Sequence, residues 1–472
     1  MDTTVLIAGA GPTGLTLAIE LARRDVAVRL VDKADEYFTG SRGDGLQPRT
    51  LEVFEDLGVL DAVLAAGAPP FRMKVHLDGR FVQERTMAET VEPTPAVPYP
   101  NAWFLGQSQT EGILRDRLAE FGVRVELGAG LAGFTQDEDD VTAQLSTGET
   151  VRAEYLVGAD GGKSFVRKTL GIPFEGTTDE TIRMLLGDVQ AEGLAHDSAY
   201  WFATADNPMT GVIFTPLAGT PHFQFGAPLG DEEAATSLPA LQARLDAVSG
   251  GGIRLHDLAW STVWRPNVRL AASFRQGRVF LAGDAAHVHP PTGGQGLNTG
   301  VQDAYNLGWK LASGSPALLD SYEPERRAVA ARVLGVSTAI MEKYTDGDED
   351  AHRRGDETKQ LDIGYRGGPL APASTGALRA GDRAPDAPLA DANGKAVRLF
   401  ELFRGPHATE LVFGAGAASG EFPVHRILPA GSAVSGADLV DVGGHAFAAY
   451  EATAGRRVVI RPDGYVWSIS ER

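Results

Sequence analysis

The sequence contains no cysteine among its 472 residues. Disulfide bonds, thiolate metal ligands and catalytic thiols are therefore excluded. No apolar run is long enough to cross a bilayer. The N-terminus also lacks the basic segment and the longer apolar core of a signal peptide. We therefore expect a cytoplasmic protein without a membrane partner.

Positive charge is also scarce. The chain has 43 lysine and arginine residues against 62 acidic residues, which gives a formal net charge of −19. A face that binds a nucleic acid duplex needs clustered lysine and arginine, whereas only short pairs such as Arg23-Arg24 and Arg326-Arg327 occur here. We therefore expect no nucleic acid partner. The length is that of about two to four ordinary domains.

Glycine, in contrast, is plentiful, and its first cluster is "GAGPTG", from Gly9 to Gly14. The β-prone run Thr4–Ala8 precedes this cluster, and apolar residues with the period of a helix follow it from Leu15 to Ala22. In such a unit the first glycine permits a tight turn and the second lets a pyrophosphate approach the backbone. The third lets the helix pack closely on the strand.

Asp32 ends the next predicted strand, Val26–Lys33. An acid at this place can accept hydrogen bonds from the ribose hydroxyls of an adenosine. With the glycines, both strands and the acid in place, the pattern predicts dinucleotide binding. It does not distinguish FAD from NAD.

A second glycine-rich turn follows a strand-like run in "YLVGADGGKSFVRKTLGI", from Tyr155 to Ile172. Its tail, Gly162-Lys163-Ser164, matches that of a nucleotide P-loop. That loop needs four residues between its glycines, and only three separate Gly158 from Gly162. We therefore do not expect a P-loop. Ser164, close to a predicted helix start, could simply be a helix cap.

A third segment, "VFLAGDAAHVHPPTGGQGLNTG", begins as a buried strand and turns at Gly283-Asp284. We expect a ligand loop, with Asp284 accepting from a polyol, a stiff wall at Pro290-Pro291, and then bare glycine backbone before a helix from about Leu297. A helix start aimed at a flat heterocycle would stabilise negative charge on it. His287 and His289 invite a metal site, but no third ligand stands at a telling spacing, so we expect no metal and at least one structural histidine.

The three motifs together resemble the FAD-dependent aromatic hydroxylases of the para-hydroxybenzoate hydroxylase type, which are single-component flavoprotein monooxygenases. The resemblance covers about residues 1–345. The tail, with "GDRAPDAPL" and "RPDGYV", is similar to the thioredoxin-like domain of bacterial enzymes that act on polyketide phenols. It has no Cys-x-x-Cys pair, which rules out redox activity there and leaves packing or assembly as its role.

The resemblance implies an α/β fold. It has a Rossmann-like FAD-binding domain, an inserted mixed or antiparallel β-sheet substrate domain, and a small thioredoxin-like α/β C-terminal domain. The expected FAD-binding domain is discontinuous, over residues 1–74, 107–180 and 270–345. The middle domain takes residues 75–106 and 181–269, and apolar and polar residues alternate over residues 181–265. A helix or linker at 346–380 leads to the C-terminal domain at 381–472.

The resemblance also implies roles for individual residues. Gly9, Gly11 and Gly14, with Pro12 and Thr13, would hold the FAD pyrophosphate. Asp32, where the family usually has glutamate, and Lys33 would lie at the adenosine ribose. Arg42 would lie beside the phosphates and the NADPH approach, Gln107 and Asp284 at the ribityl chain, and Asp160 at both FAD and NADPH. Pro291 and the backbone of Gly294, Gly296, Leu297 and Asn298 would enclose the isoalloxazine. No catalytic side chain is expected beyond the flavin, which Arg42 and Pro291 would support.

The activity implied is hydroxylation of an aromatic, phenolic or polyketide substrate. NADPH is the co-substrate, and O2 reacts through a flavin C4a-hydroperoxide. Aromatic side chains could line the substrate pocket, with ordinary core packing as the alternative for each: Trp103, Trp201, Phe214, Phe223 and Phe225. The assembly is expected to be a monomer or homodimer. Four other outcomes stay open: Baeyer–Villiger oxidation, oxidative inactivation of an antibiotic, a flavin dehydrogenase without oxygen transfer, and a nucleotide-binding protein without turnover.

Overall fold

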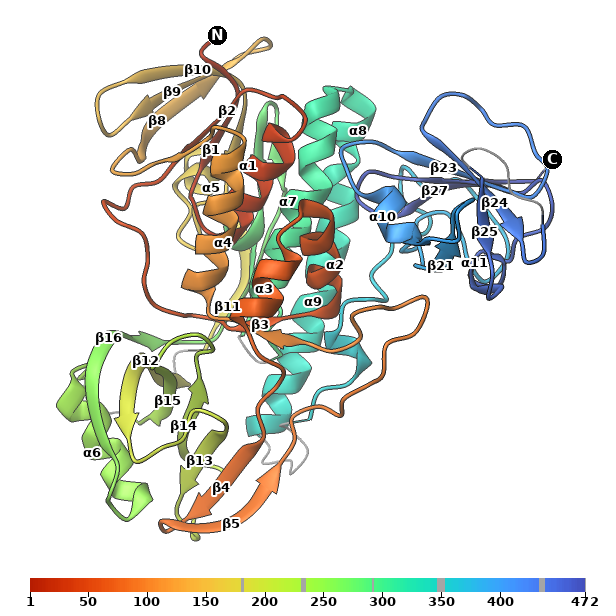
Figure 1. Ribbon diagram of the computed structural model, residues 1–472. Helices are drawn as coiled ribbons and strands as arrows, with labels where there is room; N and C mark the ends of the chain where they lie inside the picture. Colours follow the sequence, from red (N-terminus) through yellow and green to blue (C-terminus); the bar gives the residue numbers. More distant parts are fainter. Residues whose placement is uncertain (180–181, 231–234, 291–292, 346–352, 433–437, 472) are drawn as a thin grey trace.

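The computed structural model describes residues 1–179, 182–230, 235–290, 293–345, 353–432 and 438–471. Figure 1 shows three parts, each built on its own large sheet. The described residues include no helix that is both long and apolar enough to span a membrane.

The first part is built on a sheet with a parallel centre. Its central strands, in their order across the sheet, are β19 (Val279–Leu281), β10 (Thr150–Gly158), β1 (Thr3–Ala8), β2 (Val28–Val31) and β7 (Val125–Glu126). Antiparallel strands extend this centre: β18 (Arg275–Gln276), β9 (Val141–Leu145) and β8 (Leu131–Gln136). This is the Rossmann-like arrangement that the first motif predicts.

Helix α1 (Pro12–Ala22) lies against this sheet and contacts both α4 (Gln107–Glu120) and α7 (Gly296–Ser313). The sequence predicts one buried face for α1, but Leu17 and Leu21 are buried as well as Leu15 and Ile19. The reason is that neighbouring helices cover the sides that a helix at the surface would expose.

Further helices complete this part: α2 (Pro48–Leu57), α3 (Leu60–Ala66), α5 (Phe165–Thr169), α8 (Pro316–Asp320) and α9 (Tyr322–Thr345). Two small sheets join it to the second part. One pairs β3 (Gly45–Leu46) with β6 (Trp103–Phe104), and the other contains β11 (Phe174–Thr178), β17 (Asn267–Ala271) and β20 (His287–Val288).

The second part is a seven-stranded sheet. Its strands in order are β16 (Arg254–Trp264), β12 (Arg183–Glu192), β15 (Phe223–Leu229), β14 (Gly211–Pro216), β13 (Ala199–Ala203), β4 (Met73–Leu77) and β5 (Arg80–Arg85). Neighbours are antiparallel except β13 and β4. One face packs on α6 (Leu238–Ser249), a helix that the alternating pattern did not predict, and Leu241 and Leu245 of α6 are fully buried there.

The third part is the C-terminal domain, drawn in blue in Figure 1. Its strands in order are β22 (Ala396–Arg398), β21 (Pro388–Ala390), β25 (Leu439–Asp441), β24 (Val424–Pro429), β23 (Thr409–Phe413), β26 (Arg457–Ile460) and β27 (Val466–Ser470). Short helices α10 (Leu399–Phe403) and α11 (His445–Ala449) accompany them. Its core is separate from that of the first part. The predicted α/β class is confirmed, while the domain boundaries stay a prediction.

A buried ionic network fastens the C-terminal domain to α7 and α9. Arg461, between β26 and β27, donates to both carboxylate oxygens of Glu325 at 2.8 and 2.9 Å and to Asp463. Lys310 of α7 donates to the same Glu325 at 2.7 Å. All four side chains are at most 1% exposed. The attraction of Arg461 and Lys310 outweighs burial and lowers the pKa of Glu325 to about 2.

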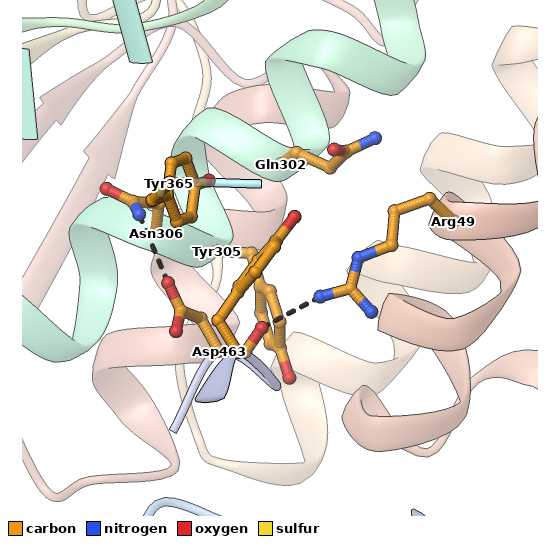
Figure 2. Close-up of a pocket in the computed structure, with 7 residues that line it drawn as sticks. Arg49, Gln302, Tyr305, Asn306, Tyr365 and Asp463 are labelled. Atoms are coloured by element: carbon orange, nitrogen blue, oxygen red, sulfur yellow. Dashed lines mark hydrogen bonds between the residues drawn. The ribbon is translucent and has the colours of Figure 1, made fainter. Parts of the chain in front are cut away.

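Figure 2 shows the neighbouring crevice, where Asn306 and Arg49 both donate to Asp463. Gln302, Tyr305, Tyr365 and Tyr465 also line this crevice. The side chains leave no room for a water molecule, so we regard the crevice as part of the domain junction and not as a ligand site.

Replacing Arg461 by methionine tests this junction. The substitution Arg461→Met leaves Asp463 and Glu325 buried with one cation fewer, and a broken buried ion network costs about 3–5 kcal/mol. We expect the urea unfolding midpoint and Tm of the full chain to fall accordingly. The matched control is Arg366→Met, since Arg366 pairs with Asp382 at the surface, where such a pair contributes about 0–1 kcal/mol. Equal effects of the two substitutions would contradict this account.

Candidate functional site

The first glycine motif packs directly against the second. Gly9 follows β1 with a φ of +106°, and a Cβ atom there would overlap the backbone of Ala159 and Asp160. Parallel pairing of β1 with β10 brings these turns together, and the N–H of Ala159 donates to the carbonyl of Ala8 at 2.8 Å. A Cβ atom at Gly14 would overlap the carbonyl oxygen of Gly9. Only glycine therefore fits both positions, and the strand-to-helix turn is as tight as a dinucleotide fold requires.

Both motifs also contact the third, at the turn after β19. Thr13, in the first turn of α1, lies so close to Gly283 and Gly300 that a Cβ atom on either glycine would collide with its hydroxyl oxygen. Arg167 of the second motif donates from Nη1 to the carbonyl oxygen of Ala285 at 2.8 Å. Three segments far apart in the sequence thus meet at one place.

The backbone at Gly11 is the exception to this close packing. Among the described residues, and leaving out its chain neighbours, a Cβ atom at Gly11 would meet only one atom within 4 Å, Oε1 of Glu111 at 4.0 Å. Gly11 stands just before α1, whose first residues are Pro12 and Thr13. The free N–H groups of a helix start attract an anion. The open backbone and the helix start therefore leave a place for a diphosphate.

Asp32 and Lys33 follow β2, beside the first turn. The carboxylate of Asp32 accepts from the N–H of Ala10 at 2.7 Å and from the N–H of Ala34 at 2.9 Å. These bonds hold the acid next to the glycines and leave lone pairs free on both oxygens. The side chain of Lys33 is exposed.

In the second motif, Asp160 and Ser164 both cap the short helix α5. Oδ2 of Asp160 accepts from the N–H groups of Phe165 and Val166, and the hydroxyl of Ser164 accepts from the N–H of Arg167 at 3.0 Å. The helix-cap interpretation of Ser164 is therefore confirmed. Oδ1 of Asp160 is buried and has no hydrogen-bond partner within the described part of the chain.

Arg42 lies between the first and third motifs. Its guanidinium is 4.8 Å from the ring of Phe38, and its charge acts on the carboxylates of both Glu111 and Asp284. Asp284 is accessible to solvent, but the protein around it displaces enough water to raise its pKa, against the charges of His287 and Arg42. Gln107, the first residue of α4, donates from Nε2 to Oε1 of Glu111 at 2.7 Å.

The loop before α7 is tied to β3 by Asn298. Its Nδ2 donates to the carbonyl oxygens of Gly45 at 2.8 Å and Gly294 at 2.6 Å, and its Oδ1 accepts from the N–H of Gln47. Gly296 begins α7, and Leu297 is half-buried beside it. Pro291, predicted to face the flavin, lies outside the described residues.

His287 is a structural residue, as one of the two histidines was expected to be. Its Nε2 lies 2.7 Å from Oδ2 of the buried Asp303, which also pairs with Arg326. His289 stacks on His287 with ring centroids 6.3 Å apart. The described residues contain no group of three or more histidine, aspartate or glutamate side chains that could hold a metal ion.

A clamp from the middle sheet holds the loop that carries Arg42, and sequence reasoning missed it. Oδ2 of Asp188 accepts from the N–H of Ser41 and from Nε1 of Trp260, both at 2.6 Å. Gln224 donates to the carbonyl oxygen of Ser41 at 2.6 Å. One sequence signal could have pointed to this clamp. Asp188 is an acid within the otherwise apolar run "RMLLGDV". Burial raises the pKa of Asp188 to about 7.

The strand register shows which side chains share the face that carries the clamp. Trp201 pairs with Ile213, Ile213 with Gly226, and Gly226 with Leu186, two residues before Asp188. Directly paired residues point to the same side of a sheet. We call this the clamp face, and it consists of Leu186, Asp188, Trp201, Ile213, Gln224, Gly226 and Trp260.

The other predicted pocket aromatics lie elsewhere. Phe214, Phe223 and Phe225 belong to the fully buried core against α6, on the face opposite the clamp. Their packing matches the core alternative, because alternation alone could not tell which face α6 would cover. Trp103, in β6, is half-buried, packs against Gly67, and has no hydrogen-bond partner for its buried Nε1 among the described residues.

Comparison with known proteins agrees with this geometry. The profile of the family described as "FAD binding domain" matches residues 2–337. A flavin-dependent monooxygenase of Mycobacteroides abscessus is 45% identical, over 99% of this chain and 97% of that protein. The chain belongs to this family of FAD-binding monooxygenases. The resemblance drawn from the three motifs is therefore confirmed.

Another relative matches over a smaller share. A 6-methylpretetramide 4-monooxygenase of Streptomyces rimosus is 40% identical over 71% of this chain and 62% of its own length. Among solved structures, aklavinone-11 hydroxylase with FAD and aklavinone has a TM-score of 0.84 at 28% identity, covering 100% of this chain and 96% of that one. The fold therefore extends through the C-terminal domain.

The residues present fit an FAD. The backbone is bare at Gly11 and packed at Gly9 and Gly14, which is the division that a diphosphate on a helix start requires. Asp160 carries a buried oxygen that has no hydrogen-bond partner among the described residues, and Asp284, in the turn after β19, is exposed. These are acceptors for hydroxyl groups.

The close contact at Gly14 gives a first prediction for this site. In Gly14→Ala the added methyl group must displace the carbonyl of Gly9 and shift the start of α1. A shift that costs about 3 kcal/mol weakens binding about 100-fold. We expect FAD retention, followed by flavin fluorescence, to fall by at least that factor. The control is Gly335→Ala in α9, where no atom of the described residues lies within 4 Å of the added Cβ. Equal FAD binding by both variants would contradict the packing argument.

Asp188 gives a second prediction, on pH and stability. The carboxyl ionises near pH 4 in the unfolded chain but near pH 7 in the folded protein. The folded state binds more protons between these values, so this group lowers stability as pH rises from about 4 to 7. Asp188→Asn should therefore be more stable than the parent by an amount that grows with pH, at most about 4 kcal/mol. Tm measured from pH 5 to about 8 checks this, and a gain independent of pH, or one shared by Asp246→Asn on the exposed side of α6, would refute it.

Proposed function

We propose that this protein is an FAD- and NADPH-dependent monooxygenase that transfers one oxygen atom from O2 to an aromatic substrate, of phenolic or polyketide type. The observation that carries the proposal is the convergence of three turns beside Arg42, with the clamp face of the middle sheet attached to the same loop. A cofactor site and a second, partly apolar wall thus adjoin each other. Relatives named for tetracycline-type and rifampicin substrates support the substrate class.

In this proposal, residues of the three motifs bind different parts of FAD. Gly9, Gly11 and Gly14, with Pro12 and Thr13, hold the diphosphate, and Asp32 and Lys33 lie at the adenosine. Gln107 and Asp284 lie at the ribityl chain, and Asp160 takes part in binding both FAD and NADPH. Arg42 faces the phosphates and the incoming NADPH. Gly294, Gly296, Leu297 and Asn298 supply the backbone around the ring, together with Pro291.

The protein supplies position and charge, and FAD supplies oxygen activation and transfer when bound. Helix α7 begins at Gly296, after a loop that Asn298 fixes to Gly45. The positive end of its dipole favours negative charge on a flat ring placed there. The apolar members of the clamp face are Leu186, Trp201 and Ile213. They would exclude water from the side of the flavin ring opposite α7, and they would hold an aromatic substrate by burying its apolar surface and by stacking. Trp103 would lie at the pocket edge.

The domain assignment follows from the same proposal. Residues 1–74, 107–180 and 270–345 form the FAD-binding domain, and residues 75–106 and 181–269 form the substrate domain. Residues 346–380 connect them to the C-terminal domain at 381–472. The ionic junction at Arg461 supports packing, of the two roles packing and assembly, for the C-terminal domain.

The test is turnover by the purified, FAD-loaded chain. NADPH oxidation and O2 consumption are measured against a panel of phenols and polyketide phenols, and products are weighed by mass spectrometry. We expect at least one compound to stimulate NADPH oxidation at least about tenfold and to gain one oxygen atom. Catalase controls separate oxygen transfer from release of hydrogen peroxide, and NADH in place of NADPH tests the co-substrate.

Three results would overturn the proposal in different ways. A chain that takes up no FAD would remove the cofactor assignment. NADPH oxidation without O2 consumption would indicate a flavin dehydrogenase. A ring-expanded ester or lactone would indicate Baeyer–Villiger oxidation in place of hydroxylation.

A further inference from the structure

Glu111 is a carboxylate placed where the cofactor's most negative group is expected. It lies in α4 and is only 4% exposed. Of the atoms in the described part of the chain, its Oε1 is the one within 4.0 Å of the Cβ position of Gly11, excluding the glycine's chain neighbours. Gly11 is the open backbone position before α1, so any diphosphate that binds there comes close to this carboxyl group.

Glu111 has few partners for a buried acid. Gln107 donates one hydrogen bond to Oε1 at 2.7 Å. The nearest cation is Nη1 of Arg115, 3.7 Å from Oε2, which is too far for a hydrogen bond. Arg115 is itself held over the ring of Tyr37, with its guanidinium 4.0 Å from the ring centroid. Among the described residues, Glu111 therefore has an ion pair with Arg115 at 3.7 Å but no cation within hydrogen-bond distance that would fix it as an anion.

The groups around Glu111 act on its pKa in opposite directions. Burial raises the pKa of Glu111, and the negative charge of Asp32 raises it further, while the bond from Gln107 and the charges of Arg115 and Arg42 lower it. A bound diphosphate adds two negative charges on the Gly11 side and displaces water. Both effects disfavour the carboxylate and favour the neutral acid.

We propose that Glu111 is a further FAD-contacting residue, which takes up one proton from solvent as the cofactor binds and faces the diphosphate as a neutral carboxylic acid. The acid form can donate a hydrogen bond to a phosphate oxygen, which the carboxylate cannot do. The inference requires FAD binding only, and it does not depend on oxygen transfer or on the substrate.

The experiment is calorimetric titration of FAD into the full-length chain after FAD removal, in buffers that differ in ionisation enthalpy. The heat difference between buffers gives the number of protons taken up per FAD. Measured from about pH 5 to pH 9, this number should pass through a maximum of about one in the unmodified chain. Over the pH range where this number is about one, Kd for FAD should rise about tenfold per pH unit.

Glu111→Gln should bind FAD with a proton number near zero and a Kd that changes little with pH, since glutamine is an uncharged donor of the same shape. The matched control is Glu120→Gln, an exposed acid of the same helix that pairs with Arg117, and it should behave like the parent. Tm and far-UV circular dichroism verify that each variant is folded.

Two results would overturn the proposal. The first is FAD binding by the unmodified chain without proton uptake at any pH, and this measurement needs no variant. The second is an unchanged proton number in folded Glu111→Gln. Proton-linked FAD binding without any oxygenated product would leave the proposal intact and would instead reject the monooxygenase assignment under "Proposed function".

Discussion

The site depends on one packing constraint, which is direct contact between backbone atoms of the glycine turns at the end of β1. The backbone of Gly9 packs directly against the turn that follows β10. The backbone of Gly14 packs directly against the carbonyl group of Gly9. Thr13 fills the space beside Gly283 and Gly300. A methyl group at any of these glycines would push α1 away from the sheet. The close fit fixes the helix start that attracts an anion, and it fixes Asp160 and Asp284 relative to that start.

Much of this part of the fold could be predicted, because its signals are local. The period of α1, the spacing of its glycines and the acid after β2 lie within the first 33 residues or so, and each has a single physical reading. The Asp-Gly turn and the "GDAAH" segment likewise follow buried strands. Their mutual contact could be expected, since the carboxyl ends of parallel strands meet at one edge of a sheet.

The rest depends on contacts between distant strands, which one sequence does not reveal. Phe225 and Gln224 alternate along β15 in the same way whichever face is covered. Helix α6 decides that the phenylalanine side is core, and its helical period at Leu238, Leu241 and Leu245 lies within a segment otherwise typical of sheet. The hydrogen bonds from Asp188 and Gln224 to the backbone of Ser41 could not be predicted either, because they join segments that are distant in the sequence. Glu111 is visibly one turn from Gln107, but only the packing of α4 on α1 turns it toward Gly11.

The ionic junction has a consequence for the order of biosynthesis. Glu325 and Lys310 become buried when α7 and α9 pack, yet Arg461, which holds both oxygens of Glu325, is translated long after either helix. Domains generally fold from the N-terminus during synthesis. A nascent chain that has completed α9 therefore holds Glu325 against Lys310 alone among these cations, inside the helix pair whose other end forms the loop before α7. The second cation that Glu325 contacts is supplied only when the tail has been made.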